Sequence, residues 1–391
     1  MATPSRRRRR LAAPALALAA ALAAAGCASA AAGTADTSAS APARDAAAIT
    51  SAQAAQAFGN YVAVTGRAVT THSGALALSV VTGVQQSVLS AELKRHGTSV
   101  SSAVAANSAG GAYKSTLTLQ LTPLGPYTYG TPAFYLPEPA GYPRFFVANV
   151  TRTLQGINLP DGMGINTWLG GASVPLDGRV LMVFEQSSAA SPWLLASTSQ
   201  LPAGTTVPPL ATDKNGDVPQ VPLTSAGLLA QPDATGPLQA AVVDDGPASA
   251  ASKAVAAGPL TTAMYQAARD RTGTGLQAPA GDVYQWAMQG TPYPAFALRT
   301  AAGGALVLYS MYLSSTVATP SYINKGDPIV PGPPIEVPDY LSLILPAKQP
   351  TPRVDLEAQN LLSFAAVDPP PGTAKIQVIA IGGGLNYATA S

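Results

Sequence analysis

The chain has 391 residues, of which 22 are Lys or Arg and 20 are Asp or Glu, so charged residues make up only 11% and the formal net charge is +2. So little charge excludes a coiled coil and a charge-rich disordered chain. The single cysteine excludes a disulfide scaffold and a zinc site built from cysteines. The length fits two domains of roughly 100–200 residues each.

Residues 1–26 have the pattern of an export signal. Five arginines at 6–10 precede an apolar stretch at 11–26, which is shorter than the ~20 residues of a membrane-spanning helix. Small residues then lead to Cys27, and this stretch resembles a bacterial lipobox. The resemblance implies cleavage before Cys27 and a lipid on its sulfur. The alternative is ordinary secretion with cleavage after Ala30.

Removal of residues 1–26 changes the charge of the chain, because they hold five arginines and no acid. The remaining chain has 17 basic and 20 acidic residues, a net charge of −3, with no basic run to follow a phosphate backbone. We therefore expect no nucleic-acid partner. The expected partners are the membrane, through the N-terminal lipid, and a cell-wall or envelope-protein ligand. The expected location is outside the cytoplasm, anchored to the cell membrane, with secretion as the alternative.

Residues 27–48 lack large apolar side chains and predict a flexible tether. A helix is predicted at 51–70, and a second one from 74 to 96, where Leu76, Val80, Val84 and Val88 recur every four residues. Strands are predicted at 115–122, 133–136, 143–151, 179–186 and 193–200. These elements compose a first domain over 49–205.

A Pro-rich segment at 206–236 predicts a linker to a second domain at 237–391. Helices are predicted there at 237–243, 248–256, 260–271 and 283–289. Strands are predicted at 295–300, 305–313, 340–345 and 375–381, with a segment of mixed character at 355–366. Helices followed by a sheet, twice over, indicate two α+β domains and not a parallel βαβ array. The halves share this order without convincing residue identity, so an ancient duplication stays open.

A helical hairpin followed by an antiparallel sheet is similar to the NTF2-like cone, over 51–200 and more loosely over 237–390. The chain also resembles exported lipoproteins of uncharacterised function that are common in actinobacteria. The segments that carry this resemblance are 133–146, 180–186 with Trp193, 293–300 and 303–308. It implies two tandem domains, each with N-terminal helices packed on a curved antiparallel sheet. It brings no assigned activity.

Prolines and aromatic residues concentrate at 123–146. Prolines stiffen an extended backbone, and aromatic rings give a large contact area at low entropic cost. If this segment is exposed, its binding residues are predicted to be Tyr127, Tyr129, Tyr135 and Tyr142. The alternative is a long hairpin whose aromatic rings pack into the core of the first domain. A second Pro-rich loop, 326–338, is a candidate flank for a site between the domains.

No recognisable catalytic set is present in the sequence. His72 and His96 stand at helix ends, and there is no G-x-S-x-G motif. The acidic run at 213–217 fails the calcium-loop pattern and predicts a turn. Three glycines at 382–384 follow a strand without a helix after them, so we expect no phosphate site there.

We therefore expect no cofactor and no metal. The predicted function is binding of a ligand or envelope partner without catalysis, through the aromatic loops or the cleft between the domains. The alternative is an envelope hydrolase or isomerase with its active site inside an NTF2-like cone. Such an enzyme would need a buried Asp or Glu of raised pKa, paired with Tyr or His.

Overall fold

The computed structural model describes residues 49–96, 127–138, 141–155, 166–169, 172–175, 177–270, 283–319, 334–335, 352 and 354–391. Asp45–Ser391 form one compact unit, and the other unit, Met1–Arg44, lies outside the described residues together with Cys27. The strands expected at 115–122 and 340–345 and most of the loop at 326–338 also lie outside them. Among the described helices, none has the length and apolar character needed to cross a membrane.

Three helices open the described chain: α1 (Ser51–Thr70), α2 (Gly74–Leu78) and α3 (Gly83–His96). A capping box of Thr50 and Gln53 starts α1. The helix expected from 74 to 96 is interrupted at 79–82, because this backbone pairs with a strand. Leu195 N donates to Val80 O at 3.0 Å, and Thr82 N donates to Leu195 O at 2.8 Å. The four-residue spacing of the valines reflects helical periodicity only, so it could not predict this pairing with a strand that is distant in the sequence.

The first half of the chain continues as strands, and those expected at 133–136, 143–151, 179–186 and 193–200 are confirmed as β2, β3, β6 and β7. The strands are β1 (Tyr127–Tyr129), β2 (Ala133–Tyr135), β3 (Arg144–Leu154), β4 (Asn166–Leu169), β5 (Ala172–Pro175), β6 (Gly178–Gln186) and β7 (Leu194–Gln200). β4 and β5 pair only with each other.

The second half again places helices before strands. The elements are η1 (Pro232–Ala234), α4 (Thr235–Asp245), η2 (Ala250–Lys253), α5 (Thr262–Arg269), β8 (Val283–Gly290), β9 (Phe296–Arg299), β10 (Ala305–Ala318), β11 (Asp355–Asp368) and β12 (Gln377–Ala390). The helix expected at 248–256 is only the short 3₁₀ turn η2. The helix expected at 283–289 is wrong, because β8 pairs with β10 along its whole length. The period-two spacing of Tyr284, Trp286 and Met288 suits a strand.

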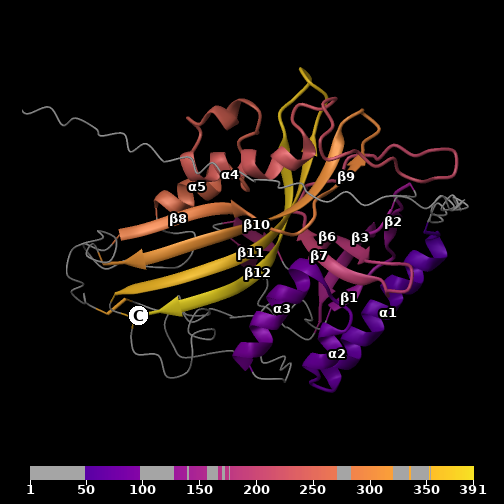
Figure 1. The fold of residues 1–391 in the computed structure, drawn as a ribbon, viewed down its shortest axis with the longest axis horizontal. Helices are drawn as coiled ribbons and strands as arrows, with labels where there is room; N and C mark the ends of the chain where they lie inside the picture. The colour runs from indigo at the N-terminus through magenta and orange to yellow at the C-terminus, as the bar shows by residue number, and fades with distance from the viewer. Residues whose placement is uncertain are drawn as a thin grey trace, which may run out of the picture. The chain divides into compact units, whose positions relative to one another are not determined.

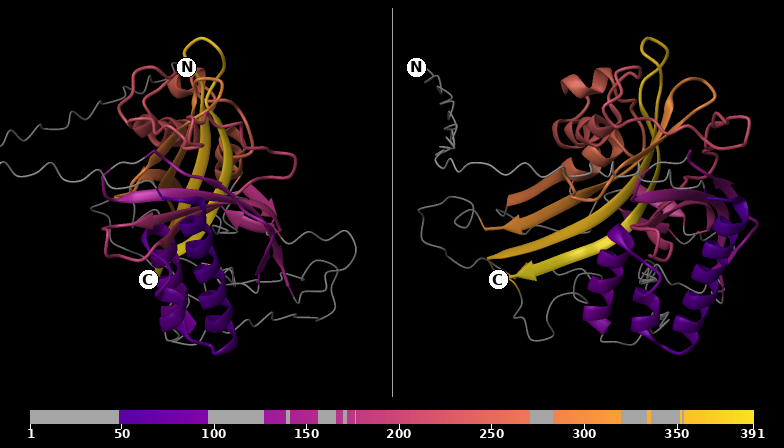
Figure 2. Two further views of the ribbon diagram at one scale, coloured as in Figure 1. Left: turned by 90° about the vertical axis from the view of Figure 1, so that its right-hand side faces the viewer. Right: turned by 45° about the vertical axis from the view of Figure 1, so that its right-hand side comes forward.

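The α+β class is confirmed. Ten strands form one antiparallel sheet in the order β1-β3-β6-β7-β12-β11-β10-β8, with β2 also on β3 and β9 also on β10 (Figure 1). α3 packs on β7, and α4 packs on β8. Figure 2 shows α1–α3 gathered beside the strands of the first half, while α4 and α5 lie over the strands of the second half. α3 also packs on β12, so this helix of the first half covers strands of both halves of the sheet.

The two halves of the sheet repeat one topology. In the first half, β1 and β2 both pair with β3, which is followed by β6 and β7; in the second, β8 and β9 both pair with β10, which is followed by β11 and β12. The segment before the last helix also forms a parallel bridge at the start of the last strand in each half, Val81 with Leu195 of β7 and Val255 with Ile376 just before β12. We call α1 to β7 the first repeat and α4 to β12 the second repeat.

The repeats meet where Gln200 of β7 pairs with Ile381 of β12. These two residues are equivalent, because each lies five residues beyond the parallel bridge at Leu195 or Ile376. The strands approach closely here: a Cβ on Gly382 would collide with the carbonyl oxygen of Thr198. The glycine run at 382–384 thus permits backbone contact between the repeats.

The Pro-rich segment at 206–236 lies against the sheet. Val218 forms a bridge with Pro137 of the first repeat, and Gln220 forms one with Leu298 of the second. Val218 and Val221 are buried. The segment expected as a linker therefore supplies core side chains, and the division into two domains stays a prediction.

Candidate functional site

The four tyrosines predicted for binding do not form one surface. Tyr142 is exposed, with the Arg144 guanidinium carbon 4.8 Å from its ring centre. Tyr135 packs on the sheet face away from α1, and its hydroxyl accepts a 2.7 Å hydrogen bond from Asn149. Tyr127 and Tyr129 lie together on β1, and Tyr129 packs on the helix-side core as the alternative prediction proposed.

Tyr127 and Tyr129 belong to a polar group inside the first repeat, which we call the tyrosine–arginine cluster: Tyr61, Tyr127, Tyr129, Arg152 and Gln200. The Arg152 guanidinium carbon lies 4.3 Å from the centre of the Tyr127 ring, and Arg152 Nη2 donates to Gln200 Oε1 at 2.9 Å. Gln200 Nε2 in turn donates to the carbonyl oxygen of Asp177 at 3.3 Å. The cation–π contact and the bond to Gln200 fix the direction of the guanidinium.

The tyrosine rings are held by edge contacts. The ring centres of Tyr61 and Tyr129 are 6.4 Å apart, those of Tyr127 and Tyr129 are also 6.4 Å apart, and Phe58 approaches Tyr129 to 5.6 Å. A hydrogen bond joins the hydroxyls of Tyr61 and Tyr129. α1 and β1 therefore position these phenols from opposite sides.

Burial raises the pKa of Tyr61, Tyr127 and Tyr129, and the Arg152 charge opposes this only in part. The phenols therefore stay protonated at neutral pH and offer hydrogen-bond donors. The charge of Glu92, a buried residue of α3, adds to the rise in the pKa of Tyr127. Arg152 Nε is buried without a hydrogen-bond partner among the described residues. The cluster thus combines a cation with neutral phenols in a largely desolvated place, and the nearby acid Glu92 acts on Tyr127.

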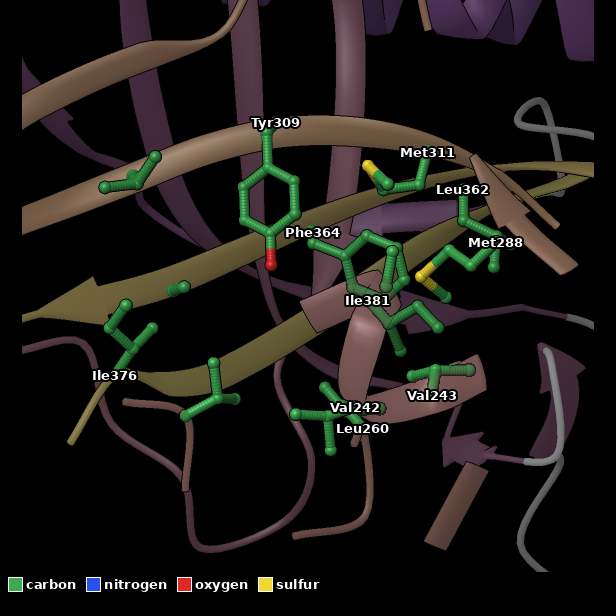
Figure 3. Close-up of a cluster of buried hydrophobic side chains, with 14 of the residues drawn as sticks. Val242, Val243, Leu260, Met288, Tyr309, Met311, Leu362, Phe364, Ile376 and Ile381 are labelled. Atoms are coloured by element: carbon green, nitrogen blue, oxygen red, sulfur yellow. The ribbon is translucent and has the colours of Figure 1, made fainter. Parts of the chain in front are cut away.

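The second repeat has positions equivalent to those of the cluster, and there the side chains only pack in the core. By strand register, the equivalent pairs are Tyr127 and Met288, Tyr129 and Gly290, Arg152 and Met311, and Gln200 and Ile381. Met288, Met311 and Ile381 are buried in an apolar core (Figure 3). Apolar residues therefore satisfy this topology, whereas desolvating a guanidinium has a cost. The polar residues of the first repeat are not required by the fold.

Sequence reasoning identified two members of the cluster and missed the others. Arg152 and Gln200 lie near the ends of β3 and β7, and Tyr61 lies within α1. No local motif marks them. Alignment of the two halves strand by strand would have revealed them, because the first half has polar residues at positions where the second half has apolar ones.

The other singled-out residues have structural roles where they are described. The Asp213 carboxylate accepts from the backbone N–H groups of Asn215 and Asp217, at 2.7 and 2.9 Å, which confirms the expected turn. His72 lies just after α1 with a φ of 51°. Among the described residues, no group of three or more His, Cys, Asp or Glu side chains is placed to hold a metal.

Comparison with known proteins gives a family and no activity. No curated protein and no solved structure matches the chain. A family model described as a domain of unknown function, DUF8094, matches residues 45–385, which is most of the chain and includes both repeats. The chain therefore belongs to the DUF8094 family.

Proposed function

We propose that this is an exported, lipid-anchored protein of the actinobacterial cell envelope that binds a polar ligand at the tyrosine–arginine cluster, without catalysis. In this proposal each repeat is an NTF2-like cone, and only the first has kept a site in its interior. The observation that carries the proposal is the replacement of a sufficient apolar core by Tyr127, Arg152 and Gln200 at equivalent positions. The N-terminal pattern that ends at Cys27 supports export and the anchor.

The chemistry of the cluster favours a ligand rich in acceptor oxygens. Arg152 has an unsatisfied N–H, and the phenols of the cluster are protonated donors. Tyr127, Tyr129 and Arg152 are partly and not fully buried. Sugar hydroxyls and peptide carbonyls both fit these donors, and both occur in cell-wall fragments.

The test uses Arg152→Met, which gives the first repeat the residue that the second repeat has at Met311. Soluble peptidoglycan fragments are titrated into the full chain by calorimetry. We expect Arg152→Met to weaken binding about tenfold or more, since hydrogen bonds to charged groups contribute about 1.5–3 kcal/mol. The free energy of unfolding should stay within about 1 kcal/mol of wild type or rise, because methionine suits this position.

Arg179→Met is the matched control, because Arg179 is an exposed residue of β6. It removes the same charge and should leave binding unchanged. Equal affinities of the wild type and Arg152→Met would refute the cluster as the ligand site.

A second candidate function is an envelope hydrolase or isomerase that uses the same cluster. The observation in its favour is Glu92, a buried acid near enough to Tyr127 to raise the pKa of its phenol. Under this candidate, wild-type protein converts a bound fragment, which changes the fragment's mass if it is hydrolysed and changes its NMR spectrum at constant mass if it is isomerised. Glu92→Gln should not convert the fragment, although it still binds. Fragments with unchanged mass and an unchanged NMR spectrum after prolonged incubation would eliminate this candidate.

A further inference from the structure

A hollow lies where the two repeats meet, and it shares no residue with the tyrosine–arginine cluster. It is small and open: about 20 Å³ of it can be occupied by the centres of water-sized spheres. It is lined by residues of both repeats, among them Gly83, Glu185, Ser197, Tyr293, Phe296 and Ser310. A site here exists only because the repeats are joined.

Glu185 is the one ionisable carboxylate of this lining. It lies near the end of β6, with Phe145 and Leu194 as its strand partners. Burial raises the pKa of its carboxyl group, and no described residue donates a hydrogen bond to it or pairs with its charge. A partly desolvated carboxylate without a partner is unfavourable. The hollow therefore presents one negative charge that a cationic ligand could neutralise.

The walls of the hollow are aromatic and already fixed. Phe296 packs against Phe145 with ring centres 4.2 Å apart and ring planes tilted by 30°. The Tyr293 hydroxyl lies 2.5 Å from Ser87 Oγ of α3, and Ser310 Oγ lies 2.7 Å from Thr291 Oγ1. These contacts position the rings without a ligand. Aromatic faces attract cations, and this attraction adds to that of the carboxylate.

We propose that this hollow binds a compact ligand with a primary ammonium group, which donates to the Glu185 carboxylate between the rings of Tyr293 and Phe296. An ammonium has three donors and one charge, and therefore matches a lone carboxylate with free acceptor oxygens. The small volume limits the ligand to a short aliphatic amine or to the amine-bearing end of a longer chain.

The experiment titrates the full chain with n-butylammonium chloride and, separately, with sodium butyrate, followed by NMR chemical shifts. We expect saturable shifts with butylammonium only. Glu185→Gln should weaken this binding at least tenfold, and Glu138→Gln, which changes an exposed glutamate, should leave it unchanged. Ser197→Val narrows the hollow and keeps the Glu185 charge, so it should also weaken butylammonium binding. It provides the test if Glu185→Gln does not fold.

Three outcomes would overturn the proposal: shifts that do not saturate, equal binding of butyrate, or unchanged binding by both Glu185→Gln and Ser197→Val. The tyrosine–arginine cluster is tested separately, because Arg152→Met should leave amine binding intact. Failure of one site therefore does not imply failure of the other.

Discussion

Asp368 is fully buried at the end of β11, in the turn that leads to β12. One carboxylate oxygen accepts from the backbone N–H of Ala230 at 3.4 Å, and the other has no partner among the described residues. Desolvation raises the pKa of this carboxyl to about 6 from an ordinary 3.8, and the backbone N–H groups of Ala230 and Leu229 oppose the rise. The charged form is thus disfavoured in the folded protein.

This carboxyl makes stability depend on pH. Between about pH 4 and 6 the folded protein keeps a proton that the unfolded chain has released, so the free energy of unfolding falls as pH rises through this window. Asp368→Asn keeps an acceptor and removes the titration. We expect wild type to lose about 1–2 kcal/mol more than Asp368→Asn between pH 4.5 and 7.5, measured by urea unfolding.

Asp233→Asn is the control for this measurement, because Asp233 is an exposed residue of η1. It should keep the wild-type pH dependence. If the free energy of unfolding of Asp368→Asn depended on pH as steeply as that of the wild type, the Asp368 carboxyl would ionise normally in the folded protein.

At the scale of elements, β12 depends on its glycines. The strand was expected to end at 381 but runs to Ala390, through three glycines that intrinsic propensity disfavours in strands. Gly382 has no room for a Cβ beside Thr198, and Gly383 has a φ of 106°. Close packing between the repeats therefore outweighs local preference here.

Gly382→Ala should force β12 away from β7. Overpacking usually costs about 1–3 kcal/mol, and a collision with backbone cannot be relieved by a rotamer change, so we expect a loss of about 3 kcal/mol or more in the free energy of unfolding. Gly290→Ala is the matched strand control, since a Cβ at Gly290 meets nothing within 4 Å. A cost below about 0.5 kcal/mol for Gly382→Ala would contradict the close approach of the repeats.

The elements that sequence predicts well are those whose signal is local. The helix expected at 51–70 matches α1, and short continuous apolar runs make β3 and β6 predictable. β8 was mistaken for a helix because its partner β10 is distant in sequence, and the break between α2 and α3 arises from pairing with Leu195. The site follows the same rule: aromatic density marks Tyr127 and Tyr129, whereas only the fold brings Arg152 and Gln200 to them.

For the whole molecule, the expected membrane attachment depends on one atom, the sulfur of Cys27. Cys27→Ser should release the protein into the medium and abolish the mass increment of the lipid, because serine cannot carry the thioether. Cell fractionation and intact mass measure the two effects. A Cys27→Ser protein that stays in the membrane fraction would refute lipidation and leave cleavage after Ala30 as the better prediction.

The pairing of Gln200 with Ile381 has the geometry of an isologous dimer interface, in which equivalent residues of two subunits meet across a twofold axis. In a true homodimer every substitution appears twice, so a polar residue at this position would face its own copy. Covalent linkage removes that constraint, because each half has its own sequence. One half can then specialise in binding while the other maintains the packed interface.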